Sequence, residues 1–213
     1  MEIEEQRPRL RGVFHFYAFF AAIAGGVVLV AIADGVSARL ASLIYGAALA
    51  AMFGASALYH RVQWRSAARR LWARRLDHSM IFVFIAGTYT PFVMLVLNGW
   101  LRIGVLAGVW GGVLLGLLLS FLWIHAPRWI TAIAYLAVGW IGAPAIPQLM
   151  HQDGIASMVL LAVGGGLYSL GAVAYATKRP NPYPRYAGFH EVFHLLVVVA
   201  AASQFVAVAL VVT

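Results

Sequence analysis

Apolar stretches long enough to cross a membrane follow one another along almost the whole chain, separated only by short loops. A helix of roughly 20 apolar residues spans the hydrocarbon core of a bilayer, which is about 30 Å thick. The pattern therefore predicts an all-α fold, a polytopic bundle of seven transmembrane helices that forms a single domain over residues 1–213. The predicted spans are residues 14–33, 40–60, 78–97, 101–123, 129–150, 155–176 and 189–212.

The composition excludes an ordinary soluble domain. Hydrophobic residues make up 63% of the chain and charged residues only 10%, and the mean hydropathy is +0.86. A net charge of +8 would suggest a nucleic-acid partner for a soluble protein. Membrane topology explains the charge better here, so no nucleic-acid partner is expected. The chain has no cysteine, which excludes disulfides, thiolate metal ligands and cysteine nucleophiles.

The distribution of basic residues predicts the orientation of the bundle. If the N-terminus is cytoplasmic, the cytoplasmic segments hold every Lys and Arg except Arg39 and Arg102. The positive-inside rule therefore predicts a cytoplasmic N-terminus and an external C-terminus. Residues 1–12 then form a cytoplasmic segment before a first helix that is retained, because no convincing cleavage site follows it. Residues 61–76 form the longest cytoplasmic loop, which is basic and is either solvated or a short helix on the lipid headgroups.

Polar residues inside the spans are candidates for function, because an ionisable group in a membrane is costly unless it is paired or bound to metal. His190 and His194 stand four residues apart on one face of the seventh span, so both imidazoles can reach one metal ion. Ser56 and His60 have the same spacing at the end of the second span, and Asp77 opens the third. Since successive helices alternate in direction, we expect all five near the cytoplasmic face.

This set of side chains matches a catalytic zinc site, in which three neutral imidazoles leave one position open for water. Asp77 could hold or deprotonate that water, and Ser56 could orient it or support a ligand through a hydrogen bond. In the alternative interpretation, these polar side chains only form hydrogen bonds between helices, as they do in many membrane bundles.

Residues 190–194 read HEVFH, the HExxH pattern of zinc metalloproteases, with Glu191 in the position of the general base. No acidic residue follows Glu191, so the usual downstream third ligand is missing and His60 has to supply it. Glu191 is therefore either a base or an interfacial residue that faces the cytoplasmic loops. We expect His78 to pack beside the site, and His15 to lie at the membrane interface with no part in it.

Three motifs resemble the bacterial hemolysin III family: SALYHR from Ser56, RRLDHSMIFVFIAGTYTPF from Arg74 and FHEVFHLLVVVAAASQF from Phe189. That family belongs to a seven-helix superfamily with the progestin and adiponectin receptors and, more distantly, the alkaline ceramidases. The resemblance implies a bacterial inner-membrane protein with zinc on His60, His190 and His194, and with Asp77 and Ser56 beside the metal. Gln204 departs from the pattern, because relatives often carry a histidine there.

The leading functional hypothesis is a zinc-dependent hydrolase that cleaves an amide or ester bond in a membrane lipid that enters sideways. One alternative is a membrane-damaging pore former or cytolysin, although the chain lacks the polar surface that a soluble precursor needs. The other is a lipid sensor or receptor in which zinc is structural and a fourth protein ligand, such as Asp77, closes the site.

Overall fold

The computed structural model describes residues 8–152 and 154–213, which form α-helices, one short 3-10 helix and no strand apart from an isolated bridge. Seven helical stretches of this part of the chain are long and apolar enough to cross a membrane, which confirms the predicted transmembrane helix bundle. The elements are α1 (Val13–Ile32), α2 (Gly35–Arg61), α3 (Ala67–Leu95), α4 (Gly99–Leu122), α5 (Arg128–Gly139), η1 (Ala143–Ala145), α6 (Ile146–Gln152), α7 (Gly154–Thr177) and α8 (Phe189–Val212).

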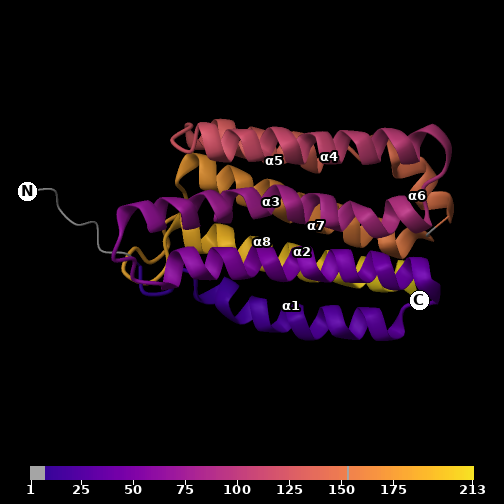
Figure 1. Cartoon of the computed structure of the whole chain (residues 1–213), viewed down its shortest axis with the longest axis horizontal. Coiled ribbons are helices and arrows are strands. Elements are labelled where there is room, and N and C mark those ends of the chain that lie inside the picture. Colours follow the sequence, from indigo (N-terminus) through magenta and orange to yellow (C-terminus); the bar gives the residue numbers. More distant parts are fainter. Residues whose placement is uncertain (1–7, 153) are drawn as a thin grey trace, which may run out of the picture.

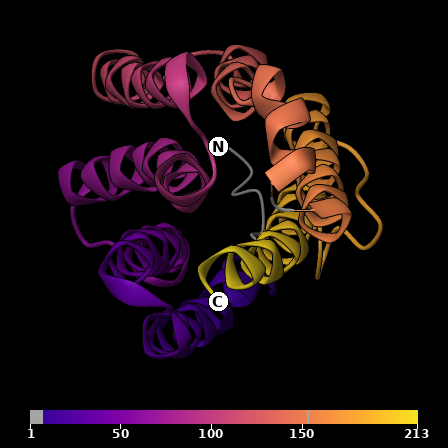
Figure 2. The ribbon, with the colours of Figure 1, turned by 90° about the vertical axis from the view of Figure 1, so that its right-hand side faces the viewer.

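The helices run roughly parallel to one long axis (Figure 1) and follow one another around the bundle when it is viewed from one end (Figure 2). Helix α8 comes last in the chain but packs against α1, α2, α3 and α7. The C-terminal helix therefore lies where it can bring its side chains to residues from early parts of the sequence.

Helix α3 begins at Ala67, eleven positions before the predicted start of the third span at residue 78. Most of the predicted loop over 61–76 is therefore the first part of a long helix. Alanine, leucine and arginine dominate this segment and have high helix propensity, which explains the extension. The Arg75 guanidinium lies 5.3 Å from the ring centroid of Trp72, one turn earlier on the same helix.

The fifth span is broken just before Pro144 and Pro147, which lack the amide hydrogen that a continuous helix requires. Helix α5 ends at Gly139, and η1 and α6 complete the crossing. The Tyr89 hydroxyl on α3 donates a hydrogen bond to the Gly139 carbonyl oxygen at 2.6 Å and accepts one from the Gly142 amide at 3.1 Å. A side chain from another helix thus satisfies backbone groups that the break releases.

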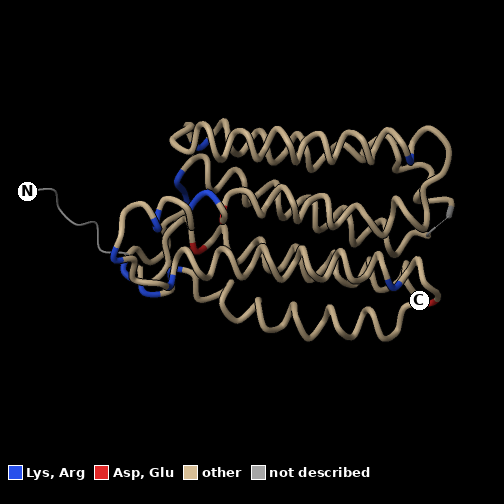
Figure 3. Tube along the Cα trace, in the orientation of Figure 1, with Lys and Arg blue, Asp and Glu red and all other residues tan. Residues whose placement is uncertain are grey.

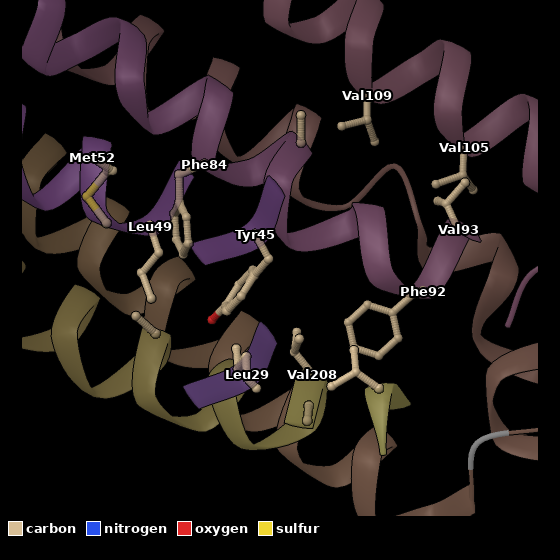
Figure 4. Close-up of a cluster of buried hydrophobic side chains, with 14 of the residues drawn as sticks. Leu29, Tyr45, Leu49, Met52, Phe84, Phe92, Val93, Val105, Val109 and Val208 are labelled. Carbon is tan, nitrogen blue, oxygen red and sulfur yellow. The ribbon is translucent and has the colours of Figure 1, made fainter. Parts of the chain in front are cut away.

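The buried core joins α1, α2, α3, α4 and α8 through large apolar side chains (Figure 4). Leu29, Tyr45 and Val208 are completely inaccessible. Small residues allow the first two helices to approach closely: a Cβ on Gly46 would lie 2.9 Å from the Cα of Gly26. Close backbone contact between glycines is a common way to pack helices in membranes, where lipid offers no hydrophobic driving force for association.

Charged residues cluster at one end of the bundle (Figure 3). We call this the basic end: it holds the C-termini of α2, α4 and α7 and the N-termini of α1, α3, α5 and α8 (Figure 1). Among the described residues, Arg39 and Arg102 are the only Lys or Arg residues of the opposite end, where Asp34 also lies. The arrangement matches the distribution from which a cytoplasmic basic end is predicted.

The contact between α1 and α2 predicts that Gly46→Leu lowers stability by about 1–3 kcal/mol, because the new side chain overpacks a backbone contact. Gly111→Leu is the matched control, since nothing lies within 4 Å of a Cβ built at that position in α4. Unfolding of the purified variants by increasing SDS in mixed micelles measures the difference. Equal stability of the two variants would contradict the packing.

The predicted orientation can be tested with single cysteines, because the natural chain has none. Arg65 and Asn98 are exposed in the loops at opposite ends of α3. In intact cells, a membrane-impermeant maleimide should label Asn98→Cys and leave Arg65→Cys unlabelled until the cells are broken. The reverse pattern would invert the topology.

Candidate metal centre

Three histidines from two distant segments meet at the basic end. His60 is in the last turn of α2, and His190 and His194 are on the first turns of α8. One ring nitrogen from each lies within 4.8 Å of those of the other two, and the Nε2 atoms of His60 and His190 are 3.1 Å apart. The structure therefore brings together the three predicted metal ligands, and this group could hold a metal ion.

The donor set fits a metal cation. Two neutral imidazole nitrogens that face each other can share one proton in a hydrogen bond, but a third convergent nitrogen lacks an equivalent donor. His194 is almost fully buried, and its Nδ1 has no hydrogen-bond partner among the described residues. A cation among the three rings would engage several lone pairs at once.

Asp77 and Ser56 lie beside this group. The Asp77 Oδ2 atom is 3.7 Å from the Nε2 of His60, and the Ser56 hydroxyl forms a hydrogen bond with the Asp77 side chain. Both residues are buried, and both line the same cavity as His190 and His194. The structure thus places all five predicted site residues at one depth, as the alternation of helix directions requires.

His15 lies in the site, where the sequence predicted an interfacial residue. Its ring is buried and stacks on His194, with centroids 3.8 Å apart and planes inclined by 4°. The prediction was wrong because proximity to the end of a span says nothing about which way a side chain points. The first turn of α1 faces α8, so His15 points into the bundle and its ring can orient the His194 imidazole.

Glu191 points away from the three histidines and is not among the residues that line the cavity. Its Oε1 atom is 2.7 Å from the Nε of Arg11, and its Oε2 accepts a hydrogen bond from the Gly188 amide at 2.8 Å. The second contact satisfies the free amide of the N-cap residue Gly188 and so caps the N-terminus of α8 from the N3 position. Glu191 therefore anchors the helix that carries the histidine pair, and both carboxylate oxygens are already engaged.

The segment before α1 lies across the basic end. The amides of Arg9 and Leu10 donate hydrogen bonds to the carbonyl oxygens of Arg185 and Tyr186, in the loop between α7 and α8. Gly12 has a φ of 74°, and a Cβ there would lie 2.6 Å from the Cβ of His60. Only glycine allows the chain to pass so close to a histidine of the site in this left-handed conformation. Of the predicted segment 1–12, residues 1–7 are outside the described residues.

A cavity of about 310 Å³ extends from the histidines toward the opposite end of the bundle. Most of its wall is apolar, and Leu97 and Val105 line its far end. Gly139 and Gly166, on α5 and α7, line the cavity and are also exposed. The cavity is therefore open beside these two helices, next to the break in the fifth span.

Fold and site together define a multi-pass membrane protein with a histidine cluster at one end of an internal cavity. The family model described as "Haemolysin-III related" matches residues 3–205, so the chain belongs to the hemolysin III family. It is 31% identical over 162 residues to the hemolysin-3 homolog of Bacillus subtilis, which covers 76% of this chain and 72% of that protein. Over 169 residues it is 30% identical to hemolysin-3 of Bacillus cereus, covering 79% and 74%.

A relative from animals is also similar over most of its length. The human monocyte to macrophage differentiation factor is 27% identical over 197 residues, which cover 91% of this chain and 79% of that protein. The family model and these relatives agree with the resemblance carried by the three motifs around Ser56, Asp77 and His190.

The ion pair at the start of α8 gives a stability prediction. Arg11→Ala leaves the Glu191 carboxylate buried without its cation. The free energy of unfolding should therefore fall by about 3 kcal/mol. In Arg11→Ala/Glu191→Gln the buried charge is gone and the amide oxygen can still cap Gly188, so part of the loss should return. SDS unfolding curves of the three proteins test this. A double variant less stable than Arg11→Ala would contradict the assignment.

Proposed function

We propose that the protein is a zinc-dependent hydrolase of amide or ester bonds in membrane lipids. The observation that carries this proposal is the position of the three-histidine group, with a carboxylate and a hydroxyl beside it, at the end of a mostly apolar cavity that is open beside α5 and α7. The same cavity would thus hold the reacting bond of a lipid at the histidines and its acyl chain along the apolar wall.

Zinc fits the donor set best among common metals. Imidazole nitrogens suit zinc, and hard cations such as magnesium and calcium prefer oxygen ligands. His60, His190 and His194 would hold the ion. When bound, zinc would act as a Lewis acid that polarises a carbonyl group and activates water.

Asp77 and Ser56 have separate roles in this mechanism. The Asp77 carboxylate lies next to His60 and accepts the proton of the water that attacks the lipid carbonyl carbon. That proton then passes to the amine or alcohol that leaves. The Ser56 hydroxyl donates a hydrogen bond to the carboxylate and so fixes the direction in which its oxygens point.

The cavity explains how a lipid can reach the site. A soluble hydrolase has to extract an acyl chain at a cost of about 0.8 kcal/mol per CH₂ group, but a chain that moves from the bilayer into an apolar cavity stays in similar surroundings. The opening between α5 and α7 supports entry from the side. In a bacterial inner membrane with the basic end on the cytoplasmic side, the site acts on lipids of the cytoplasmic leaflet.

A specific observation favours a second candidate, a lipid sensor with structural zinc. Asp77 Oδ2 lies close enough to His60 for a modest movement to make it a fourth ligand. A site closed in this way would tie α2, α3 and α8 together and leave no position for water. Metal content separates the two candidates, because a structural site depends on its fourth ligand.

Plasma mass spectrometry of the purified protein tests the metal site. We expect about one zinc per chain in the wild type, and loss of zinc from His60→Ala and His190→Ala. Asp77→Ala should keep the metal if the site is open and lose it if Asp77 is a ligand. His125→Ala, which changes an exposed histidine outside the site, is the matched control and should keep its zinc.

Hydrolysis is tested with the same variants. Incubation in a mixture of ceramides and phospholipids, with released fatty acid measured by mass spectrometry, should show turnover by the wild type and by His125→Ala. Asp77→Ala should be roughly 100-fold slower or worse, since it lacks the general base. Fatty acid released equally well by His190→Ala would exclude a metal-dependent reaction.

A further inference from the structure

The wall of the cavity contains polar groups far from the histidines. Gln204 lies ten residues after His194 on α8, about 15 Å along the helix, or roughly half the thickness of the hydrocarbon core. Its Oε1 atom is buried, and so is the hydroxyl of Tyr168 on α7. Neither atom has a hydrogen-bond partner in the described part of the chain, and both residues line the cavity.

We call the part of the cavity wall formed by Gln204 and Tyr168, together with the adjacent Gly164, the niche. Gly164 lies against Gln204: a Cβ built on this glycine would be 2.8 Å from the Cγ and 3.3 Å from the Nε2 of Gln204. Tyr168 follows Gly164 by one helical turn, so it is on the same face of α7. The glycine thus makes room for the Gln204 side chain, one turn away from Tyr168 along α7.

Aromatic rings back the niche and hold it in place. The Phe84 ring centroid is 6.2 Å from that of Tyr168 and 6.3 Å from that of Tyr45, so a single ring connects the two tyrosines. Figure 4 shows Tyr45 and Phe84 within the buried cluster of the core. The Tyr45 hydroxyl is also buried and lacks a partner among the described residues, although Tyr45 is not part of the cavity wall.

Unpaired polar groups at this depth have to be explained, because hydrocarbon offers them no hydrogen bonds. The Gln204 oxygen accepts a hydrogen bond, and the Tyr168 hydroxyl can donate one. A hydroxyl group satisfies both at once, since it donates through its hydrogen and accepts through its oxygen. A purely apolar chain leaves both groups unpaired.

We propose that Gln204 and Tyr168 form a subsite for a hydroxyl group carried well down the acyl chain of the lipid. This inference rests on one part of the proposed function, namely that the cavity holds an acyl chain whose head group lies at the histidines. It specifies the substrate class: long-chain lipids hydroxylated near the middle of the bilayer are preferred over their unsubstituted counterparts. Selectivity arises because an unsubstituted chain leaves buried polar groups unpaired.

Binding of free fatty acids tests the subsite without any turnover. Stearic acid and a series of hydroxystearic acids, which differ in the position of the hydroxyl, are titrated into purified protein while the thermal midpoint is followed. We expect the acid with its hydroxyl far from the carboxylate to bind about tenfold more tightly than stearic acid, as one additional hydrogen-bonded group allows. A hydroxyl next to the carboxylate should give no such advantage.

Gln204→Leu should abolish the preference and retain the binding of stearic acid. Gln148→Leu is the matched control: its Oε1 is also buried without a partner in the described structure, but Gln148 does not line the cavity, so the preference should remain. If the wild type binds all the acids with equal affinity, the subsite is overturned, and water is what satisfies Gln204 and Tyr168. The proposed hydrolysis is not affected by that result. Failure of every acid to bind would overturn the subsite together with acyl-chain occupancy of the cavity.

Discussion

The interior of a bilayer offers no hydrogen bonds, and this constraint accounts for most of the structure. Backbone groups satisfy one another within helices, and where the fifth span breaks, Tyr89 bonds to the released groups. Polar side chains follow the same rule. Most ionisable residues of the spans gather at the basic end, where several contact one another: His60 lies next to His190 and Asp77, and Glu191 pairs with Arg11.

Helix α8 connects these contacts. Its first turns carry both members of the histidine pair, and Glu191 secures its N-terminus through a hydrogen bond from the Gly188 amide and an ion pair with Arg11. The segment before α1 pairs with the loop that leads into α8 and passes beside His60. The site is therefore held by contacts between the two ends of the chain, and the central helices supply Asp77 and the cavity wall.

Much of the candidate site could be predicted from sequence because it depends on depth alone. Hydropathy locates the spans, and alternating directions bring Ser56, His60, Asp77, His190 and His194 to one level whatever the details of packing. The break near Pro144 follows from the missing amide of proline. The start of α3 was misplaced because hydropathy marks where a helix enters the membrane, and a helix of arginine, alanine and leucine continues beyond that point.

By itself, the sequence determined the number of spans, the family and the depth at which the polar residues meet, since hydropathy and spacing are local properties. Only the tertiary structure decided what each side chain touches. It turned His15 toward His194, engaged Glu191 with Arg11 and placed Gln204 in the wall of the cavity that ends at the histidines. The physical reason is that the contacts of a side chain depend on which neighbouring helix lies on its side of the helix, and spacing along the sequence does not specify that neighbour.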